Sequence, residues 1–276
     1  MAAVTMAAVK ELRERLGAGM LDSKNALTEA DGDIEKAIEI LRLKGLKGVA
    51  KRGDREASEG LVAVKQSEGA ATMIEFVCET DCVAKNEKFI ALAERVLDAV
   101  VAANAANAEE ALAAPAEGKT VGEVITDESA IMGERIVLRK VSRVEAPATA
   151  VYLHRTSKDL PPQIGVVVGY EGDDAKTALS IAQHTSFADP PYVTREEAPA
   201  ADVEKEREIV TEISKNEGKP EAALPKIVEG RLNAFFKQVV LNEQVHALDD
   251  EKRDVKKVAE AAGITVTSFA RSKVGA

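Results

Sequence analysis

The residues best placed to do chemistry are Thr80, Asp81 and Cys82, which follow one another at the end of an apolar run. The preceding segment, 72–78, is short and rich in branched and aromatic residues, which is typical of a strand. The segment from Phe89 onward repeats its apolar residues at helical spacing. A strand-to-helix turn can present side chains to a partner, but Thr80 or Asp81 can equally serve as an ordinary helix cap.

Residues that could support catalysis or a metal site are few. Cys78 and Cys82 have C-x-x-x-C spacing, without a further cysteine or nearby histidine to complete a zinc site. The three histidines, His154, His184 and His246, stand in no metal-ligand spacing. The sequence also lacks a G-x-S-x-G elbow, a phosphate-binding loop and a dinucleotide fingerprint. We therefore expect no metal, no cofactor and no enzymatic activity.

The composition predicts a globular chain that does not bind nucleic acid directly. Of 276 residues, 45% are hydrophobic and 30% charged, and the net charge is −10. This charge disfavours binding to a phosphate backbone, and aromatic residues, at 3%, are too few for base stacking. The sequence contains no secretory signal and no apolar run long enough to span a bilayer. We expect a cytoplasmic, reduced protein without membrane contact.

Residues 1–53 read as a three-helix docking module with a basic linker. The helices are separated by a tight turn at Gly17-Ala18-Gly19 and a break at Asp31-Gly32-Asp33. The glycine-punctuated basic segment 44–53 is interpreted as the linker.

The remaining sequence predicts two related ββααβ subdomains, at 54–145 and 146–276, in an α+β fold. Each has a strand hairpin, two helices and a closing strand, which gives an antiparallel three-stranded sheet backed by helices. The expected strands are 61–64, 73–77, 135–141, 150–154, 163–168 and 264–271, and the expected helices are 85–104, 121–132, 174–184 and 255–262.

An insertion at about 202–240 distinguishes the second half. A charged helix over 202–216 is followed by Glu217-Gly218-Lys219-Pro220, a sharp turn, and a second helix to about Val240. Pro225 fits that second helix only within its first turn or at a kink. We expect an antiparallel helical hairpin; its charged arms favour projection from the body, and packing on the core is the alternative.

Four segments, in order, resemble the bacterial elongation factor Ts family. They are 9–27, which contains Leu-Gly-Ala-Gly-Met-Leu-Asp-Ser-Lys-Asn-Ala-Leu, 31–37, the Glu-Thr-Asp-Cys-Val-Ala turn at 79–84, and the hairpin residues 217–220 with 228–231. The resemblance spans nearly the whole chain, and four motifs in the same order make it specific.

The resemblance implies a guanine-nucleotide exchange factor for elongation factor Tu, which binds the GDP-bound and nucleotide-free partner. It also implies a ubiquitin-associated-like module and a coiled-coil hairpin. By residue-wise matching, the turn of Thr80, Asp81, Cys82 and Val83 would disturb the partner's magnesium site. Further partner contacts would come from the matched residues Arg13, Met20, Leu21, Ile164, Gly165, Val166 and His184.

Position 82 departs from the family pattern, because the family usually has Phe where this chain has Cys. A phenyl ring buries about 150–250 Å², so Cys82 would be a weaker wedge. Either Asp81 and the remaining contacts carry more of the effect, or the partner has a compensating pocket. Two alternatives to the exchange factor follow from the residues: an adaptor of the same family with little exchange activity, and a thiol-dependent enzyme using Cys78 and Cys82.

Overall fold

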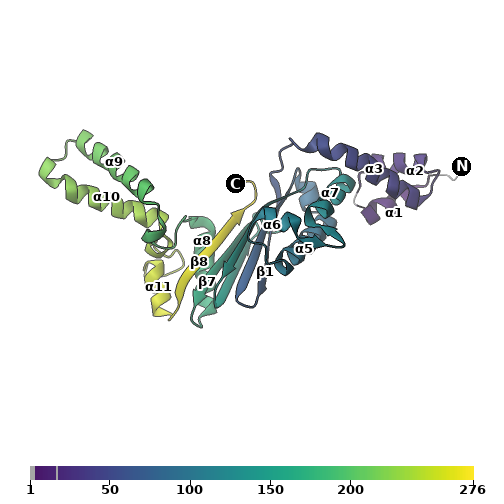
Figure 1. Ribbon diagram of the computed structural model, residues 1–276. Helices are drawn as coiled ribbons and strands as arrows, with labels where there is room; N and C mark the ends of the chain where they lie inside the picture. Colours follow the sequence, from purple (N-terminus) through teal and green to yellow (C-terminus); the bar gives the residue numbers. More distant parts are fainter. Residues whose placement is uncertain (1–3, 17) are drawn as a thin grey trace. The chain divides into compact units, whose positions relative to one another are not determined.

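The computed structural model describes residues 4–16 and 18–276. Internal contacts divide the chain into two compact units. The first comprises the chain up to Arg143, Leu153–Gly165 and Ser272–Ala276, and the second comprises Val144–Tyr152 and Val166–Arg271. Helices and strands alternate in both, so the fold is mixed α/β with small sheets (Figure 1).

The chain begins with three helices, α1 (Met6–Leu16), α2 (Met20–Glu29) and α3 (Ile34–Arg52). The predicted break is confirmed, because Asp31 and Gly32 adopt positive φ angles of 51° and 85°. The predicted turn is described only in part, since Gly17 lies outside the described residues. Their shared core consists of Val9, Leu12, Ala18, Ala26, Leu27, Ala30, Ala37 and Leu41.

The predicted linker at 44–53 is wrong, because α3 continues without interruption to Arg52. Gly45 is not a flexible joint but a contact point. A Cβ atom there would lie 2.1 Å from the backbone oxygen of Ala130, so the missing side chain lets another helix approach. The glycines predicted a linker, whereas Gly45 allows two helices to pack closely.

The first sheet has the strand order β1-β2-β5, formed by β1 (Glu59–Ser67), β2 (Ala70–Cys78) and β5 (Val137–Glu145). The hairpin of β1 and β2 is antiparallel and pairs Glu59 with Cys78 and Ser67 with Ala70. Every residue of β2 is buried, which makes it the central support of this unit.

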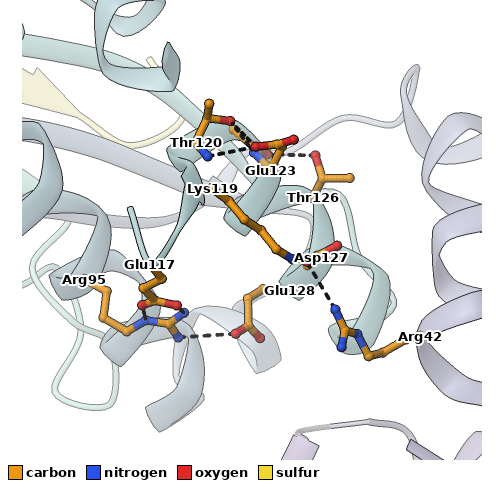
Figure 2. Close-up of polar contacts among 10 residues, drawn as sticks. Arg42, Arg95, Glu117, Lys119, Thr120, Glu123, Thr126, Asp127 and Glu128 are labelled. Atoms are coloured by element: carbon orange, nitrogen blue, oxygen red, sulfur yellow. Dashed lines mark hydrogen bonds and ion pairs between the residues drawn. The ribbon is translucent and has the colours of Figure 1, made fainter. Parts of the chain in front are cut away.

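Helices α4 (Asp81–Ala84), α5 (Glu87–Ala102), α6 (Ala108–Ala113) and α7 (Val121–Met132) follow or precede these strands. Helix α5 buries one apolar face, with Phe89 stacked on Phe76 of β2 at 5.1 Å between ring centroids. Helix α7 has the predicted bounds because a capping box of Thr120 and Glu123 starts it (Figure 2) and Gly133, at φ 80°, ends it. Sequence patterns did not predict α6 or the short strands β3 (Pro115–Ala116) and β4 (Lys119–Thr120).

The second sheet has the order β6-β7-β8, formed by β6 (Ala148–His154), β7 (Ile164–Glu171) and β8 (Thr265–Lys273). Helices α8 (Ala175–Ala188) and α11 (Val255–Ala261) contribute to its core. The buried members of that core are Ala150, Val166, Val168, Tyr170, Ala178, Ile181, Ala182, Val193, Leu241, Val255, Ala259, Ile264 and Val266.

The insertion is a pair of helices, α9 (Ala200–Asn216) and α10 (Leu224–Val239), which lie side by side in Figure 1. Gly218 turns the chain between them at φ 73°, and Pro225 lies in the first turn of α10, as its sequence position requires. Their seam has a small core of its own, made of Val210, Val228 and Leu232. Three short 3-10 helices, Arg195–Glu197, Glu221–Ala223 and Leu241–Glu243, flank the two arms.

Candidate functional site

The turn at Thr80–Val83 is exposed at its tip and anchored at both ends. Thr80 is the N-cap of α4, and its hydroxyl oxygen accepts a hydrogen bond from the Val83 amide at 3.4 Å. Val83 packs against the first core and Ala84 is buried in it. Asp81 and Cys82 are exposed between these anchors, so both side chains are available to a partner.

Glu134, just beyond the end of α7, holds the start of the turn. One carboxylate oxygen accepts hydrogen bonds from the Glu79 and Thr80 amides, both at 3.1 Å. The other accepts a hydrogen bond from the Thr80 hydroxyl at 2.6 Å. Bonds to an ionised acceptor are stronger than neutral ones, so this single side chain fixes the backbone from which Asp81 projects.

The Glu79 side chain also links the end of β2 to other segments. Its carboxylate accepts a hydrogen bond from the Arg135 amide at 2.6 Å and pairs with the Arg55 guanidinium at 3.2 Å. The end of β2 and the chain before β5 are therefore tied in both directions, since Glu134 accepts from the Glu79 amide and Glu79 accepts from the Arg135 amide. These bonds anchor the turn within the first unit.

Charge and thiol chemistry at the turn differ between its residues. Asp81 pairs with Lys85 one helical turn later at 2.7 Å, and the hydrogen bond from Lys85 lowers the pKa of Asp81. The carboxylate is therefore ionised at neutral pH. Burial raises the pKa of the Cys78 thiol, which also donates to the backbone oxygen of Thr80 at 3.3 Å. Cys78 is thus a protonated core residue, and only Cys82 of the two free cysteines is exposed.

The N-terminal residues matched to partner binding are accessible. Arg13 is exposed on α1, and Met20 and Leu21 at the start of α2 are 49% and 68% exposed. Large apolar side chains with this exposure are not packed into the module's own core.

The other predicted contact residues are mostly buried. Ile164 is half-buried, Gly165 is buried and Val166 lies fully inside the second core. A Cβ atom on Gly165 would lie 2.4 Å from Val62 and 3.0 Å from the sulfur of Met73. Close packing within the first unit thus explains the glycine at this position.

His184 is only 3% exposed and has both ring nitrogens occupied. Its Nδ1 accepts a hydrogen bond from the Ala247 amide at 3.2 Å, so Nε2 carries the proton and donates to the Gln244 side chain at 2.9 Å. The His246 ring stacks on it at 5.5 Å, and the exposed Phe187 meets it edge-on at 5.4 Å. His184 therefore organises the 244–247 segment.

We expect this histidine pair to make stability fall as the pH drops from 7 to 5. Burial lowers the pKa of both His184 and His246 below the ordinary 6.5. As the pH falls, the unfolded chain therefore binds protons at these rings that the folded chain does not bind, which favours unfolding. The slope contributed is at most about 1.4 kcal/mol per pH unit for each ring. Urea unfolding at pH 7 and pH 5 measures it. The H184Q/H246F variant should have a flatter profile, and an equally steep one would contradict this assignment.

Within residues 4–16 and 18–276 no group of three or more His, Cys, Asp or Glu side chains could hold a metal ion. A search of the same residues finds no helix of the length and apolarity needed to cross a membrane.

Sequence reasoning missed Glu134, Glu79 and Arg135, which fix the turn. Glu79 had a weak signal, as the charged residue between a largely apolar strand and the Thr80 cap. Glu134 had none, because only folding brings it to residues more than fifty positions earlier.

Comparison with known proteins decides between the hypotheses. A family model described as "Elongation factor TS" matches residues 79–276, beginning at Glu79 itself. Proteins named elongation factor Ts match over the full length of both chains. Identity is 69% over 276 residues in Clavibacter michiganensis subsp. michiganensis, 63% over 277 in Leifsonia xyli subsp. xyli and 55% over 278 in Micrococcus luteus.

The chain belongs to the elongation factor Ts family. The resemblance found in the sequence motifs is confirmed, and with it the assignment to translation elongation. Elongation factor Ts relatives also align with residues 1–78, which the family model does not reach. The thiol-dependent enzyme and the adaptor without exchange activity are not favoured.

Proposed function

We propose that the protein binds elongation factor Tu–GDP and promotes the exchange of GDP for GTP, with no covalent chemistry of its own. Membership of the elongation factor Ts family supports this activity. The observation that carries the mechanism is the exposed Asp81–Cys82 tip on a turn fixed by Glu134.

The turn of Thr80, Asp81, Cys82 and Val83 acts on the partner's magnesium and phosphate site. Guanine nucleotides are held largely by magnesium and by backbone contacts to the phosphates. A factor that binds best to the partner conformation lacking those contacts weakens nucleotide binding. By thermodynamic linkage, bound nucleotide weakens binding of the factor by the same free energy. The rigid, ionised Asp81 supports this role, because little ordering is needed on contact.

The N-terminal module provides separate binding energy. The exposure of Met20, Leu21 and the charged Arg13 on the module supports an apolar contact that includes a charged residue. Such a contact recruits the partner without acting on its nucleotide.

Ile164, Gly165, Val166 and His184 are further proposed partner contacts, with roles adjusted to their burial. Ile164 is partly accessible to a partner. Gly165 and Val166 are buried, so they can contribute to partner binding only through their backbone or through the shape of the surface. His184 supports the surface through the 244–247 segment and the exposed Phe187.

The finer architecture is part of the same proposal. We assign a ubiquitin-associated-like module to 1–53, related subdomains to 54–145 and 146–276, and a coiled coil to about 202–240. Three packed helices, two three-stranded sheets and the separate seam of α9 and α10 support it. Two free cysteines support a reducing, cytoplasmic location. The assigned partner is a protein, with no nucleic acid or membrane contact.

Replacing Asp81 by Ala should lower the maximal rate of GDP release about 10- to 100-fold, because a charged group acting at a closed interface is worth several kcal/mol. The free energy of unfolding should change little, since Asp81 is exposed and its ion pair with Lys85 lies at the surface. Asp98→Ala is the matched control, because it removes an exposed carboxylate paired with Lys65 at 2.6 Å. Equal losses in the two variants would refute a specific role for Asp81.

The proposal is tested by the release of fluorescent GDP from elongation factor Tu, with and without the protein. We expect release to accelerate with added protein and to saturate. Complex formation without acceleration would instead identify an adaptor.

A further inference from the structure

Helices α3 and α7 approach each other closely at Gly45. A Cβ atom on Gly45 would lie 2.1 Å from the backbone oxygen and 2.8 Å from the Cβ of Ala130. Real Cβ atoms do not approach so closely, so any larger residue at position 45 must separate the helices.

Polar contacts reinforce this meeting on both sides. The Arg52 guanidinium donates to the backbone oxygens of Gly45 at 3.2 Å and Ser129 at 3.4 Å. Arg42 reaches Asp127 at 3.4 Å, and Lys119 also binds that carboxylate (Figure 2). We call the contacts of Gly45, Arg52 and Arg42 with α7 the α3–α7 seam.

The far end of α7 leads directly to the functional turn. The Ser129 hydroxyl donates a hydrogen bond to the backbone oxygen of Glu134. Glu134 then binds the Glu79 and Thr80 amides. An unbroken series of contacts therefore runs from α3, through the last turn of α7, to the backbone that carries Asp81.

A cavity of about 300 Å³ lies beside the seam, lined in part by Lys44, Gly45, Arg52 and Ile131. Because a Cβ on Gly45 would overlap the backbone of Ala130, the closeness of the two helices at this position depends on the glycine.

We propose that the α3–α7 seam is a positioning element, with Gly45 as its key residue, that holds the docking module and the Thr80–Val83 turn as one preformed surface. This inference rests on the proposed exchange function for its purpose. Displacing Ala130 should shift Ser129 and Glu134 and loosen the turn, although Gly45 contacts neither Thr80 nor Asp81. Because the seam holds the docking module and the turn in place before the partner binds, less conformational entropy is lost on binding.

The first test is residue-resolved amide hydrogen exchange on the free, full-length protein. Gly45→Ala should accelerate exchange at the Glu79 and Thr80 amides about tenfold, which corresponds to ~1.4 kcal/mol in local opening. Alanine favours helix over glycine, so α3 itself should not unravel. Unchanged exchange at both amides would overturn the proposal.

Two controls separate positioning from general damage. Gly230→Ala makes the same change in α10, where nothing lies within 4 Å of the new Cβ, and should leave both amides unaffected. Leu27→Ala weakens the core of the module without touching the seam, and should also leave them unaffected. Equal acceleration by Leu27→Ala would overturn the seam's role. Should Gly45→Ala not fold, Arg42→Ala must give a smaller acceleration at the same amides, and no acceleration would overturn the proposal.

The second test uses GDP release. Gly45→Ala should lower the maximal rate, whereas Leu27→Ala should mainly raise the concentration needed for half-maximal rate. A lowered maximal rate for Leu27→Ala but not for Gly45→Ala would contradict the seam. Failure of the wild-type protein to release GDP would count against the proposed function alone, because amide exchange is measured without the partner.

Discussion

Replacing Glu134 by Ala should lower the maximal rate of GDP release about 10- to 100-fold while the partner still binds. The carboxylate accepts three hydrogen bonds from Glu79 and Thr80. Without it, two backbone amides and a hydroxyl must turn to water, and Asp81 loses its fixed direction. Steady-state and single-turnover release kinetics measure the effect.

Glu134→Gln is the matched control for that variant. The amide oxygen can accept from the two backbone amides, and its NH₂ group can donate to the Thr80 hydroxyl oxygen. We expect this variant to retain most of the rate. A loss as large as that of Glu134→Ala would show that the charge, rather than the positioning of the turn, is what matters.

Replacing Gly165 by Ala should reduce the free energy of unfolding by about 1–3 kcal/mol, the usual cost of overpacking a tight core. The new Cβ would lie 2.4 Å from Val62 and 3.0 Å from the sulfur of Met73, and both of these side chains are buried. Urea or guanidinium unfolding monitored by circular dichroism gives the value.

The same variant separates two roles for this glycine. Ile164→Ala, at a neighbouring half-buried position, should cost less stability and is the control. Unaltered stability of Gly165→Ala together with weakened partner binding would mean that the glycine serves the partner's approach and not the packing that we describe.

The elements with strong local signals were predictable from sequence. Val121–Met132 was predicted with its true bounds, because Thr120 and Glu123 form a capping box and Gly133 ends the helix. The hairpin of β1 and β2 was found from its apolar runs, although both strands are longer than predicted. The break at Asp31–Gly32 followed from residues that tolerate positive φ.

The failures share one physical cause, which is that long-range packing overrides local preference. Glycines at 45 and 48 suggested a linker, yet contact of Gly45 with Ala130 makes that segment helix. Sequence patterns did not predict α6 or the short ribbon of β3 and β4, which lie in the alanine-rich segment 105–120.

The candidate site was predictable in its tip but not in its support. Thr80, Asp81 and Cys82 could be picked out because they adjoin a strand and a helix. Glu134 could not, since only the fold brings it beside Thr80. The burial of His184 could not be predicted either, because a single histidine does not show which face of its helix is buried.

The most direct test of the central claim is the rate of GDP release from elongation factor Tu, measured with the wild-type protein beside Asp81→Ala and Asp98→Ala. We predict saturating acceleration by the wild type and by Asp98→Ala, and a much reduced maximal rate for Asp81→Ala. No acceleration by micromolar wild-type protein that demonstrably binds the partner would contradict the account.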